Sequence, residues 1–207
     1  NVKSILSPST GLNHINVKSV PIVSVKNDKV LNNVWSTAEH TLYLMLSIVR
    51  GKHELHDKTL GIVGYGRLGK MVEQLCKPLF KEIISVDKGD SFDELYEKSD
   101  VVSIHMDYNP TTEYIIDNEF LSHFKKSIYL INTARGEIVN EKDIKHLLSV
   151  GRIKGYATDV LQTEYNEQKS AFYGVDYVIT TPHIAGTSIE AQEKTYKRVL
   201  EKYENIK

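Results

Sequence analysis

Residues 59–72, TLGIVGYGRLGKMV, place an apolar run, three glycines and an amphipathic segment in succession. The run Thr59–Val63 predicts a buried strand, and the segment that follows the glycines predicts a helix. Between them, Gly64, Gly66 and Gly69 form a GxGxxG pattern, which is informative only when it joins a strand to a helix. The stretch therefore predicts the first βα unit of a dinucleotide-binding sheet.

Each glycine of this loop has its own expected role. Gly64 permits a tight turn, Gly66 lets the backbone approach a pyrophosphate, and Gly69 lets the helix pack closely on its strand. The free N–H groups at the start of the helix, at Arg67 and Leu68, would bind phosphate oxygens with help from the helix dipole. We therefore predict that these five residues contact a dinucleotide.

An acidic residue is expected about 20 positions after the first glycine, at the end of the second strand. Asp87 closes the run IISVD and stands near that position. A carboxylate there accepts hydrogen bonds from a ribose diol and repels a 2′-phosphate, so the sequence favours NAD over NADP. The neighbouring Lys88 weakens this preference slightly.

Six short apolar runs alternate with helical patterns from residue 59 onward. This alternation is typical of a parallel sheet with crossover helices, so the predicted fold class is α/β with a doubly wound, Rossmann-type sheet. The expected strands are 59–63, 83–86, 101–104, 128–131, 155–160 and 177–180, and the expected helices between them are 67–77, 91–98, 117–124 and 140–148.

The first part of the chain has a different pattern. Residues 2–6 and 22–25 resemble strands, and residues 37–49 predict a helix too apolar to be exposed on all sides. We expect this helix to pack between domains or against a second subunit. Residues 188–203 predict a final, charged amphipathic helix.

Composition argues against several classes of protein. Lys and Arg total 26 against 27 for Asp and Glu, so the net charge of -1 gives no sign of nucleic-acid binding. No apolar run approaches the ~20 residues that span a bilayer, and the first residues lack a signal-peptide layout. The single cysteine, Cys76, is expected to be a buried apolar residue in a reducing compartment. We therefore expect a cytoplasmic protein without nucleic-acid or membrane partners.

Polar side chains follow three of the later strands. Arg135 follows the fourth run, Asp159 ends the fifth with Glu164 soon after it, and His183 follows the sixth. Each residue alone would more often be a surface charge, a helix cap or a packing residue. Because ligands bind at the carboxyl ends of strands in such sheets, the four together predict one site.

Other kinds of site have less support. His53 and His56 are three residues apart in a loop, which is not the HExxH spacing on a helix, so no metal site is expected. The sequence contains no GxSxG, so a serine hydrolase is not supported. His40 and His105 are interpreted as packing or rim residues.

Six ordered motifs resemble the D-isomer-specific 2-hydroxyacid dehydrogenases: STGLNHIN, STAEHT, GIVGYGRLG, NTARGEIVN, ATDVLQTE and TPHIAG, from about residue 8 to 190. The resemblance implies NAD as cofactor, a 2-keto or 2-hydroxy acid as substrate, a flavodoxin-like substrate domain and a homodimer. It implies catalytic roles for Arg135, Glu164 and His183. It also implies that Thr133, Ala134 and Asp159 line the nicotinamide side and that Thr10 contacts the cofactor from the other domain.

The implied reaction is reversible hydride transfer between NADH and a 2-keto acid, giving a D-2-hydroxy acid. A histidine can act as acid or base near neutral pH, so His183 is the predicted proton donor. Glu164 against the other ring nitrogen would orient the imidazole. Arg135, planar and permanently charged, suits a two-point contact with the substrate carboxylate and carbonyl.

The resemblance also predicts the domains: residues 1–35 as a partial substrate domain, 36–186 as the NAD-binding domain, and 187–207 as a helix returning to the substrate domain. Much of the substrate-binding loop is expected to lie outside this chain, so the sequence does not identify the acid. The connections 51–58 and 88–90 are short for the family. Either the protein lacks those segments or residues between them are left out of the sequence, and we favour the second explanation.

Two alternatives stay open. An NAD-sensing binding protein or corepressor would keep the fold and bind the nucleotide without turnover, but it would not need the proton donor His183. A phosphite-type dehydrogenase is also consistent with the motifs. Formate is disfavoured, because formate enzymes of this superfamily carry Gln where Glu164 stands.

Overall fold

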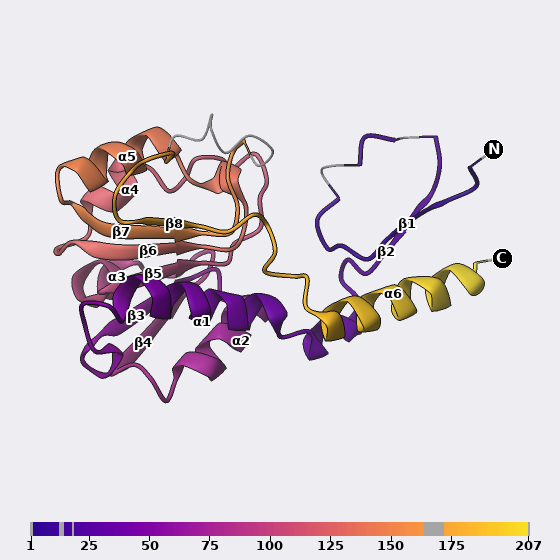
Figure 1. Ribbon diagram of the computed structural model, residues 1–207, viewed down its shortest axis with the longest axis horizontal. Coiled ribbons are helices and arrows are strands. Elements are labelled where there is room, and N and C mark those ends of the chain that lie inside the picture. Colours follow the sequence, from indigo (N-terminus) through magenta and orange to yellow (C-terminus); the bar gives the residue numbers. More distant parts are fainter. Residues whose placement is uncertain (1, 13–14, 18, 164–171, 207) are drawn as a thin grey trace. The chain divides into compact units, whose positions relative to one another are not determined.

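The computed structural model describes residues 2–12, 15–17, 19–163 and 172–206. The chain divides into two compact units. Unit 1 comprises Asn1–Ser36 together with Gly186–Lys207, and unit 2 is the continuous stretch Thr37–Ala185. Both ends of the chain therefore belong to unit 1 (Figure 1).

Unit 2 is built on a parallel sheet with the strand order β4-β3-β5-β6-β7-β8 (Figure 1). The chain moves from β3 to β4 on one side and then crosses to β5 on the other, so the topological switch point lies at the carboxyl end of β3. The predicted doubly wound sheet is confirmed. Its strands are β3 (Thr59–Val63), β4 (Glu82–Val86), β5 (Val101–Ile104), β6 (Ile128–Asn132), β7 (Ile153–Thr158) and β8 (Val178–Thr180).

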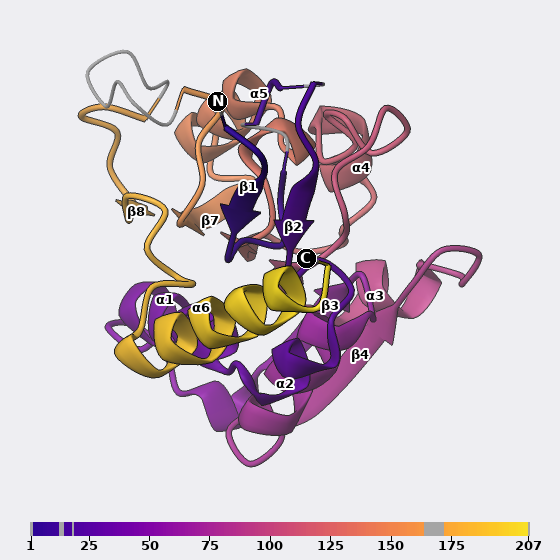
Figure 2. The ribbon, with the colours of Figure 1, turned by 90° about the vertical axis from the view of Figure 1, so that its right-hand side faces the viewer.

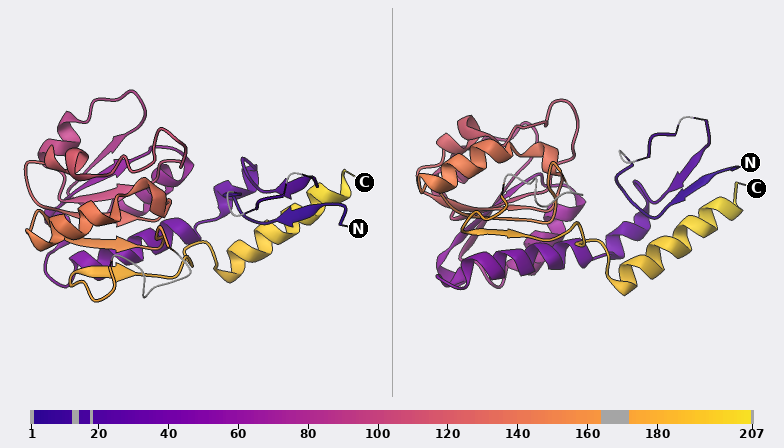
Figure 3. Two further views of the ribbon diagram at one scale, coloured as in Figure 1. Left: turned by 90° about the horizontal axis from the view of Figure 1, so that it is seen from above. Right: turned by 45° about the horizontal axis from the view of Figure 1, so that its top comes forward.

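Helices cover both faces of this sheet, with α1 and α2 on one face and α4 and α5 on the other (Figures 1 and 3). Every residue of β3, β5 and β6 is buried, as expected for parallel strands between two helical layers. The helices of unit 2 are α1 (Ser36–Val49, whose first residue belongs to unit 1), α2 (Arg67–Cys76), α3 (Asp93–Lys98), α4 (Asn118–Ser122) and α5 (Glu141–Ser149).

Polar residues fix where several helices begin. Asp117 accepts a hydrogen bond from the Phe120 N–H at the start of α4, and Asn140 accepts one from the Asp143 N–H at the start of α5. These side chains satisfy N–H groups that a helix leaves without an internal partner. Asp117 and Asn140 therefore cap these two helices.

Helix α1 is buried on one side only. Leu44 is fully buried in unit 2, whereas Tyr43 is 53% exposed and Leu46 is 38% exposed. On the buried side Ile48 lies so close to Gly155 of β7 that a Cβ on this glycine would come within 2.7 Å of it. The helix therefore rests directly on the sheet, and Leu44 cannot contact a second subunit.

Cys76 lies where α1 and α2 meet. Its Sγ is 3.9 Å from Met45 Sδ, and the side chain is fully buried. Burial raises the pKa of this thiol to about 12, because the thiolate would be desolvated. The expected burial of Cys76 is confirmed.

The two short connections are closed by local structure. The Asp90 N–H donates to the Asp87 carbonyl at 3.1 Å, and Gly89 between them has φ 94°, a conformation that glycine adopts readily. The other connection contains a short 3₁₀ helix, η2 (Leu55–Asp57). In the described part of the chain no helix is both long enough and apolar enough to cross a bilayer.

Unit 1 contains a small parallel sheet with one long helix packed on it (Figure 2). Its elements are β1 (Ile5–Ser7), β2 (Ile22–Ser24), the 3₁₀ helix η1 (Lys29–Asn33) and α6 (Ile189–Glu204). Val23, Val25 and Leu31 pack with Val199 of α6 in one apolar cluster. The N-terminal and C-terminal segments of the chain thus share this small core.

Candidate active site

The glycine-rich loop joins β3 to α2 at the switch point. Gly64 has φ 95°, and a Cβ there would come within 2.5 Å of the Met106 backbone nitrogen. A Cβ on Gly69 would come within 2.4 Å of the Gly64 carbonyl oxygen. The first and third glycines are therefore required by close backbone packing.

Gly66 has different surroundings. It caps the N-terminus of α2, and a Cβ built on it meets no atom within 4 Å. Arg67 and Leu68 follow it in the first turn of α2, at the positive end of the helix dipole. The open space at Gly66 and the N–H groups of this turn form a place where an anion can approach the backbone.

Asp87 lies beside this loop. The Gly64 N–H donates to the Val86 carbonyl at 2.9 Å, so the residue after Val86 is held next to the start of the loop. Asp87 is exposed, and its Oδ1 accepts a hydrogen bond from the Lys88 N–H at 2.9 Å. The structure thus brings the predicted acidic residue and the predicted phosphate loop to the same edge.

The turn after β6 is shaped by a buried asparagine. Asn132 Oδ1 accepts from the Ala134 N–H at 3.0 Å, and its Nδ2 donates to the Arg135 carbonyl at 2.9 Å. The Arg135 guanidinium in turn donates to the Ala134 carbonyl at 2.6 Å. Asn132, which opens the motif NTARGEIVN, was not among the predicted site residues, yet its side chain fixes the turn that carries Arg135.

Asp159, just after β7, is the centre of a hydrogen-bonded cluster. Its side chain is 1% exposed, and its backbone N–H donates to the Asn132 carbonyl at 3.0 Å. Its carboxylate accepts from the Thr181 hydroxyl at 2.6 Å and from the N–H groups of Ile184 and Ala185 at 2.9 and 2.8 Å. A buried carboxylate needs such donors, because they replace the water it loses.

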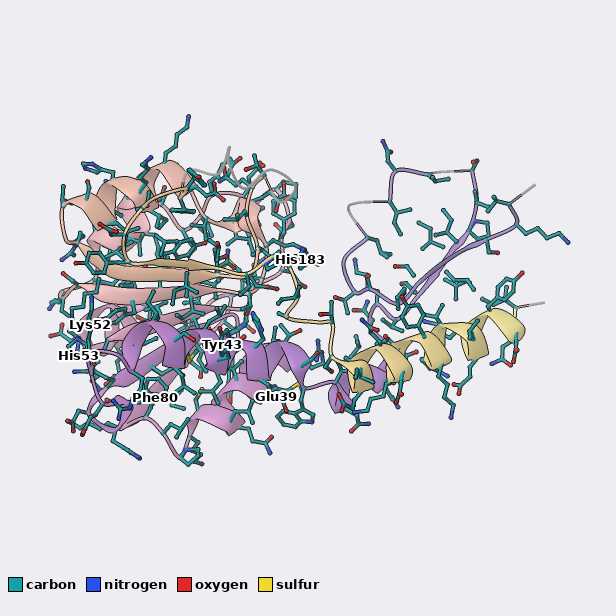
Figure 4. The ribbon with its side chains drawn as sticks, viewed as in Figure 1. Glu39, Tyr43, Lys52, His53, Phe80 and His183 are labelled. Atoms are coloured by element: carbon teal, nitrogen blue, oxygen red, sulfur yellow. The ribbon has the colours of Figure 1, made fainter. Side chains whose placement is uncertain are left out.

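His183 lies in the turn beyond β8, at the opposite end of the sheet from Lys52 and His53 (Figure 4). His183 is exposed, and its backbone N–H donates to the Asp159 carbonyl at 2.9 Å. Its φ of 53° is left-handed, which is uncommon for residues other than glycine. Asp159 therefore holds both the backbone of this turn and the two residues after it.

Helix α1 contributes two contacts that were not predicted from the sequence. His40 Nε2 lies 2.9 Å from Thr181 Oγ1 and 3.5 Å from Asp159 Oδ1. The adjacent Thr41 hydroxyl lies 2.8 Å from the Thr133 hydroxyl. His40 was predicted to be a packing or rim residue, and it contacts Thr181 and Asp159 of the site. The signal in the sequence that could have indicated this role is its place in the motif STAEHT.

Two predicted residues are not part of the described cluster. Glu164 lies outside the described residues, so its expected contact with His183 stays a prediction. Thr10 belongs to unit 1, and its expected contact with the cofactor also stays a prediction. In the described ranges no three His, Cys, Asp or Glu side chains form a group that could hold a metal ion.

Comparison with known proteins assigns the chain to a family. Residues 40–185 match the family described as "D-isomer specific 2-hydroxyacid dehydrogenase, NAD binding domain". The chain belongs to this family. It therefore contains an NAD-binding domain, and the resemblance stated from the motifs is confirmed.

Named relatives of the dehydrogenase domain include several enzymes. The chain is 29% identical to a D-specific alpha-keto acid dehydrogenase from Enterococcus faecium, over 96% of this chain and 74% of the relative. It is 28% identical to a hydroxypyruvate reductase from Thermotoga maritima, over 98% of this chain and 76% of the relative. A solved structure of D-lactate dehydrogenase from Aquifex aeolicus, complexed with NAD and lactic acid, is 27% identical with a TM-score of 0.81, over 99% of this chain and 76% of that one.

The geometry of the loop fits the cofactor of this dehydrogenase family. The space in front of Gly66 is open, whereas the positions of Gly64 and Gly69 are filled by backbone atoms. This is the arrangement expected when the middle glycine faces a pyrophosphate and the outer two serve the turn and the helix packing. The predicted cofactor, NAD, is confirmed at the level of the family's domain.

Proposed function

We propose that the protein catalyses the reversible, NAD-dependent reduction of a 2-keto acid to a D-2-hydroxy acid. The backbone N–H groups of Gly66, Arg67 and Leu68 would bind the pyrophosphate of NAD, and the Asp87 carboxylate would accept hydrogen bonds from the adenosine ribose. Thr133, Ala134 and Asp159 would border the nicotinamide side. When bound, NADH supplies the hydride that reduces the keto carbon.

The remaining chemistry belongs to side chains at the carboxyl edge of the sheet. As negative charge develops on the keto oxygen, His183 would donate a proton to it. The Arg135 guanidinium would bind the substrate carboxylate and orient the carbonyl. Glu164 would hold the His183 ring in the proton-donating orientation, and Thr10 would contact the cofactor from unit 1.

One observation carries this proposal. The Asp159 N–H donates to the Asn132 carbonyl, and the His183 N–H donates to the Asp159 carbonyl. These two bonds connect the ends of β6, β7 and β8, so the turns that carry Arg135 and His183 belong to one hydrogen-bonded edge. Together with an NAD-binding domain, such an edge supports a proton donor and an anion-binding residue beside a nicotinamide.

The names of relatives favour small 2-keto acids without selecting one of them. The test is a panel of pyruvate, glyoxylate, hydroxypyruvate and a branched 2-keto acid, followed by NADH absorbance. We expect turnover with at least one acid. His183→Asn should lower kcat by about 10²- to 10⁴-fold, because it removes a general acid. Asparagine tolerates the left-handed backbone at this position, so the turn should be retained.

The matched control is Tyr177→Asn, because Tyr177 also has a left-handed backbone, with φ 63°, but lies in an exposed position before β8. Its turnover should stay at the level of the unsubstituted protein. Full turnover by His183→Asn would refute the proposed donor. Binding of NADH without reduction of any acid would support the sensor alternative, and oxidation of phosphite with NAD would support the phosphite alternative.

We also propose a homodimer and a domain assignment. The exposed Tyr43 and Leu46 of α1 offer an apolar surface for a second copy of the chain. Residues 1–35 and 187–207 would be part of a substrate domain, and 36–186 the NAD-binding domain. The units of the structure divide the chain close to these boundaries, at residues 36 and 186.

A further inference from the structure

We propose that His40 is a positioning residue that holds the His183 turn through Thr181 and Asp159. All four residues belong to unit 2, on helix α1 and on the segments that follow β7 and β8. The catalytic consequence rests on the proposed role of His183. The contacts from which the inference starts do not depend on it.

Asp159 accepts four hydrogen bonds from the segment Thr181 to Ala185, which is also held by the Thr181 N–H donating to the Thr158 carbonyl. The Asp159 carboxylate accepts from the Thr181 hydroxyl and from the Ile184 and Ala185 N–H groups, and the Asp159 carbonyl accepts from the His183 N–H. Strained backbone such as that of His183 persists where its surroundings hold it. A displacement of Asp159 would therefore be passed on to the His183 turn.

The proton count fixes how His40 joins this cluster. Thr181 has one hydroxyl proton, and a carboxylate that already receives two N–H groups only accepts. The 2.6 Å contact between Thr181 Oγ1 and Asp159 Oδ1 therefore uses the threonine proton. At 2.9 Å from the same hydroxyl oxygen, His40 Nε2 must then be the donor. We infer that the His40 ring carries a hydrogen on Nε2 and donates it to Thr181 Oγ1.

His40 lies on helix α1, which also contacts the turn that carries Arg135. The next residue of α1, Thr41, contacts Thr133, which lies in the turn that carries Arg135. Two adjacent residues of one rigid helix thus contact both turns of the proposed catalytic edge. Loss of the His40 contact would leave Thr181 without its donor and allow the His183 turn to move relative to Arg135.

The first test needs no substrate. Amide hydrogen exchange at Ile184 and Ala185 is compared in the unsubstituted protein, His40→Leu, His40→Gln and the control Glu39→Gln. Loss of a supporting hydrogen bond should speed exchange at both amides about 5-fold or more in His40→Leu. His40→Gln keeps an N–H donor of similar reach and should stay close to the unsubstituted protein. Glu39 is the exposed neighbour on α1 (Figure 4), so Glu39→Gln should change nothing.

Unchanged exchange at both amides in a folded His40→Leu protein would overturn the inference. So would nitrogen NMR showing that His40 carries its hydrogen on Nδ1 alone. Should His40→Leu fail to fold, Thr181→Val tests the same link from the other side. It removes the hydroxyl between His40 and Asp159 and should also speed exchange at Ile184 and Ala185.

The second test uses the acid that the protein reduces fastest. His40→Leu should lower kcat roughly 10- to 100-fold, because small displacements of a catalytic group have effects of this size. KM for the acid and the dissociation constant for NADH should change by less than about 2-fold, and His40→Gln should recover most of kcat. An increase in KM with kcat unchanged would overturn the positioning role. Absence of turnover in the unsubstituted protein would instead contradict the proposed function and leave the exchange test decisive.

Discussion

His105, directly after β5, is a partly buried histidine whose environment keeps it neutral. Its Nε2 lies 2.8 Å from Ser103 Oγ, and its buried Nδ1 has no hydrogen-bond partner among the described residues. Burial lowers its pKa from the ordinary value of 6.5 to about 3, since a charged ring there would be desolvated. Its backbone also packs against Gly64, so this histidine borders the glycine loop.

This burial predicts a loss of stability in mild acid. Between pH 6.5 and about 3 the unfolded chain protonates the His105 ring while the folded protein does not, so protons favour unfolding in that window. The free energy of unfolding, measured with urea, should fall between pH 7.5 and pH 5. In His105→Asn this fall should be about 2 kcal/mol smaller than in the unsubstituted protein. His146→Asn, at an exposed position of α5, is the control and should keep the original pH dependence. An equal pH dependence in His105→Asn and the unsubstituted protein would contradict this prediction.

Single residues also show where sequence reasoning stops. The positions of Gly64, Gly69 and Asp87 were predictable, because they depend on neighbours along the chain in a strand, a turn and a helix. His40 was not, because its partner Thr181 is 141 positions away and the contact exists only once α1 lies on the sheet. The role of Asn132 was not predicted either, because a buried side chain that shapes a turn produces no periodic pattern in the sequence.

Elements were more predictable than contacts. Each strand of the sheet overlaps an expected apolar run, although β7 begins and ends two residues before the expected 155–160, and α4 and α5 start after their polar caps. The expected helices 91–98 and 117–124 were too long, because α3 begins only at Asp93 and α4 ends at Ser122. The homodimer prediction named an apolar helix, but periodicity alone could not tell which of its leucines the sheet would bury.

The exposed side of α1 allows a test of the proposed homodimer. Leu46→Glu places a charge on the apolar surface formed with Tyr43, so it should convert a dimer to a monomer, because an unpaired charge is costly to bury in an interface. Light scattering coupled to size-exclusion chromatography measures the mass directly. Val150→Glu, also at an exposed apolar position of unit 2, should leave the mass unchanged. A monomeric unsubstituted protein at micromolar concentration would refute the proposal.

At the scale of the whole molecule, the two units differ in how the chain builds them. Unit 2 is one continuous stretch with a large core, whereas unit 1 needs both the first residues and the last. Its two strands are short, and a two-stranded sheet is marginally stable alone in water. Helix α6 supplies Val199 to the apolar cluster, and Arg198 Nε donates to the mostly buried Asp28 carboxylate at 2.9 Å.

A chain that ends at Ala185 should therefore lose the structure of unit 1 and retain that of unit 2. Without α6, amides of β2 should exchange at rates close to those of an unfolded chain, because Val23 and Val25 lose their apolar cover. Amides of β3, β5 and β6 should stay protected, since their packing lies within residues 37–185. Hydrogen exchange followed by mass spectrometry resolves both regions in one experiment. Arg198→Ala in the chain of residues 1–207 should give an intermediate loss of protection confined to unit 1. If protection of β3 and β6 fell together with that of β2, the two units would fold as one cooperative body and the division of stability proposed here would be wrong.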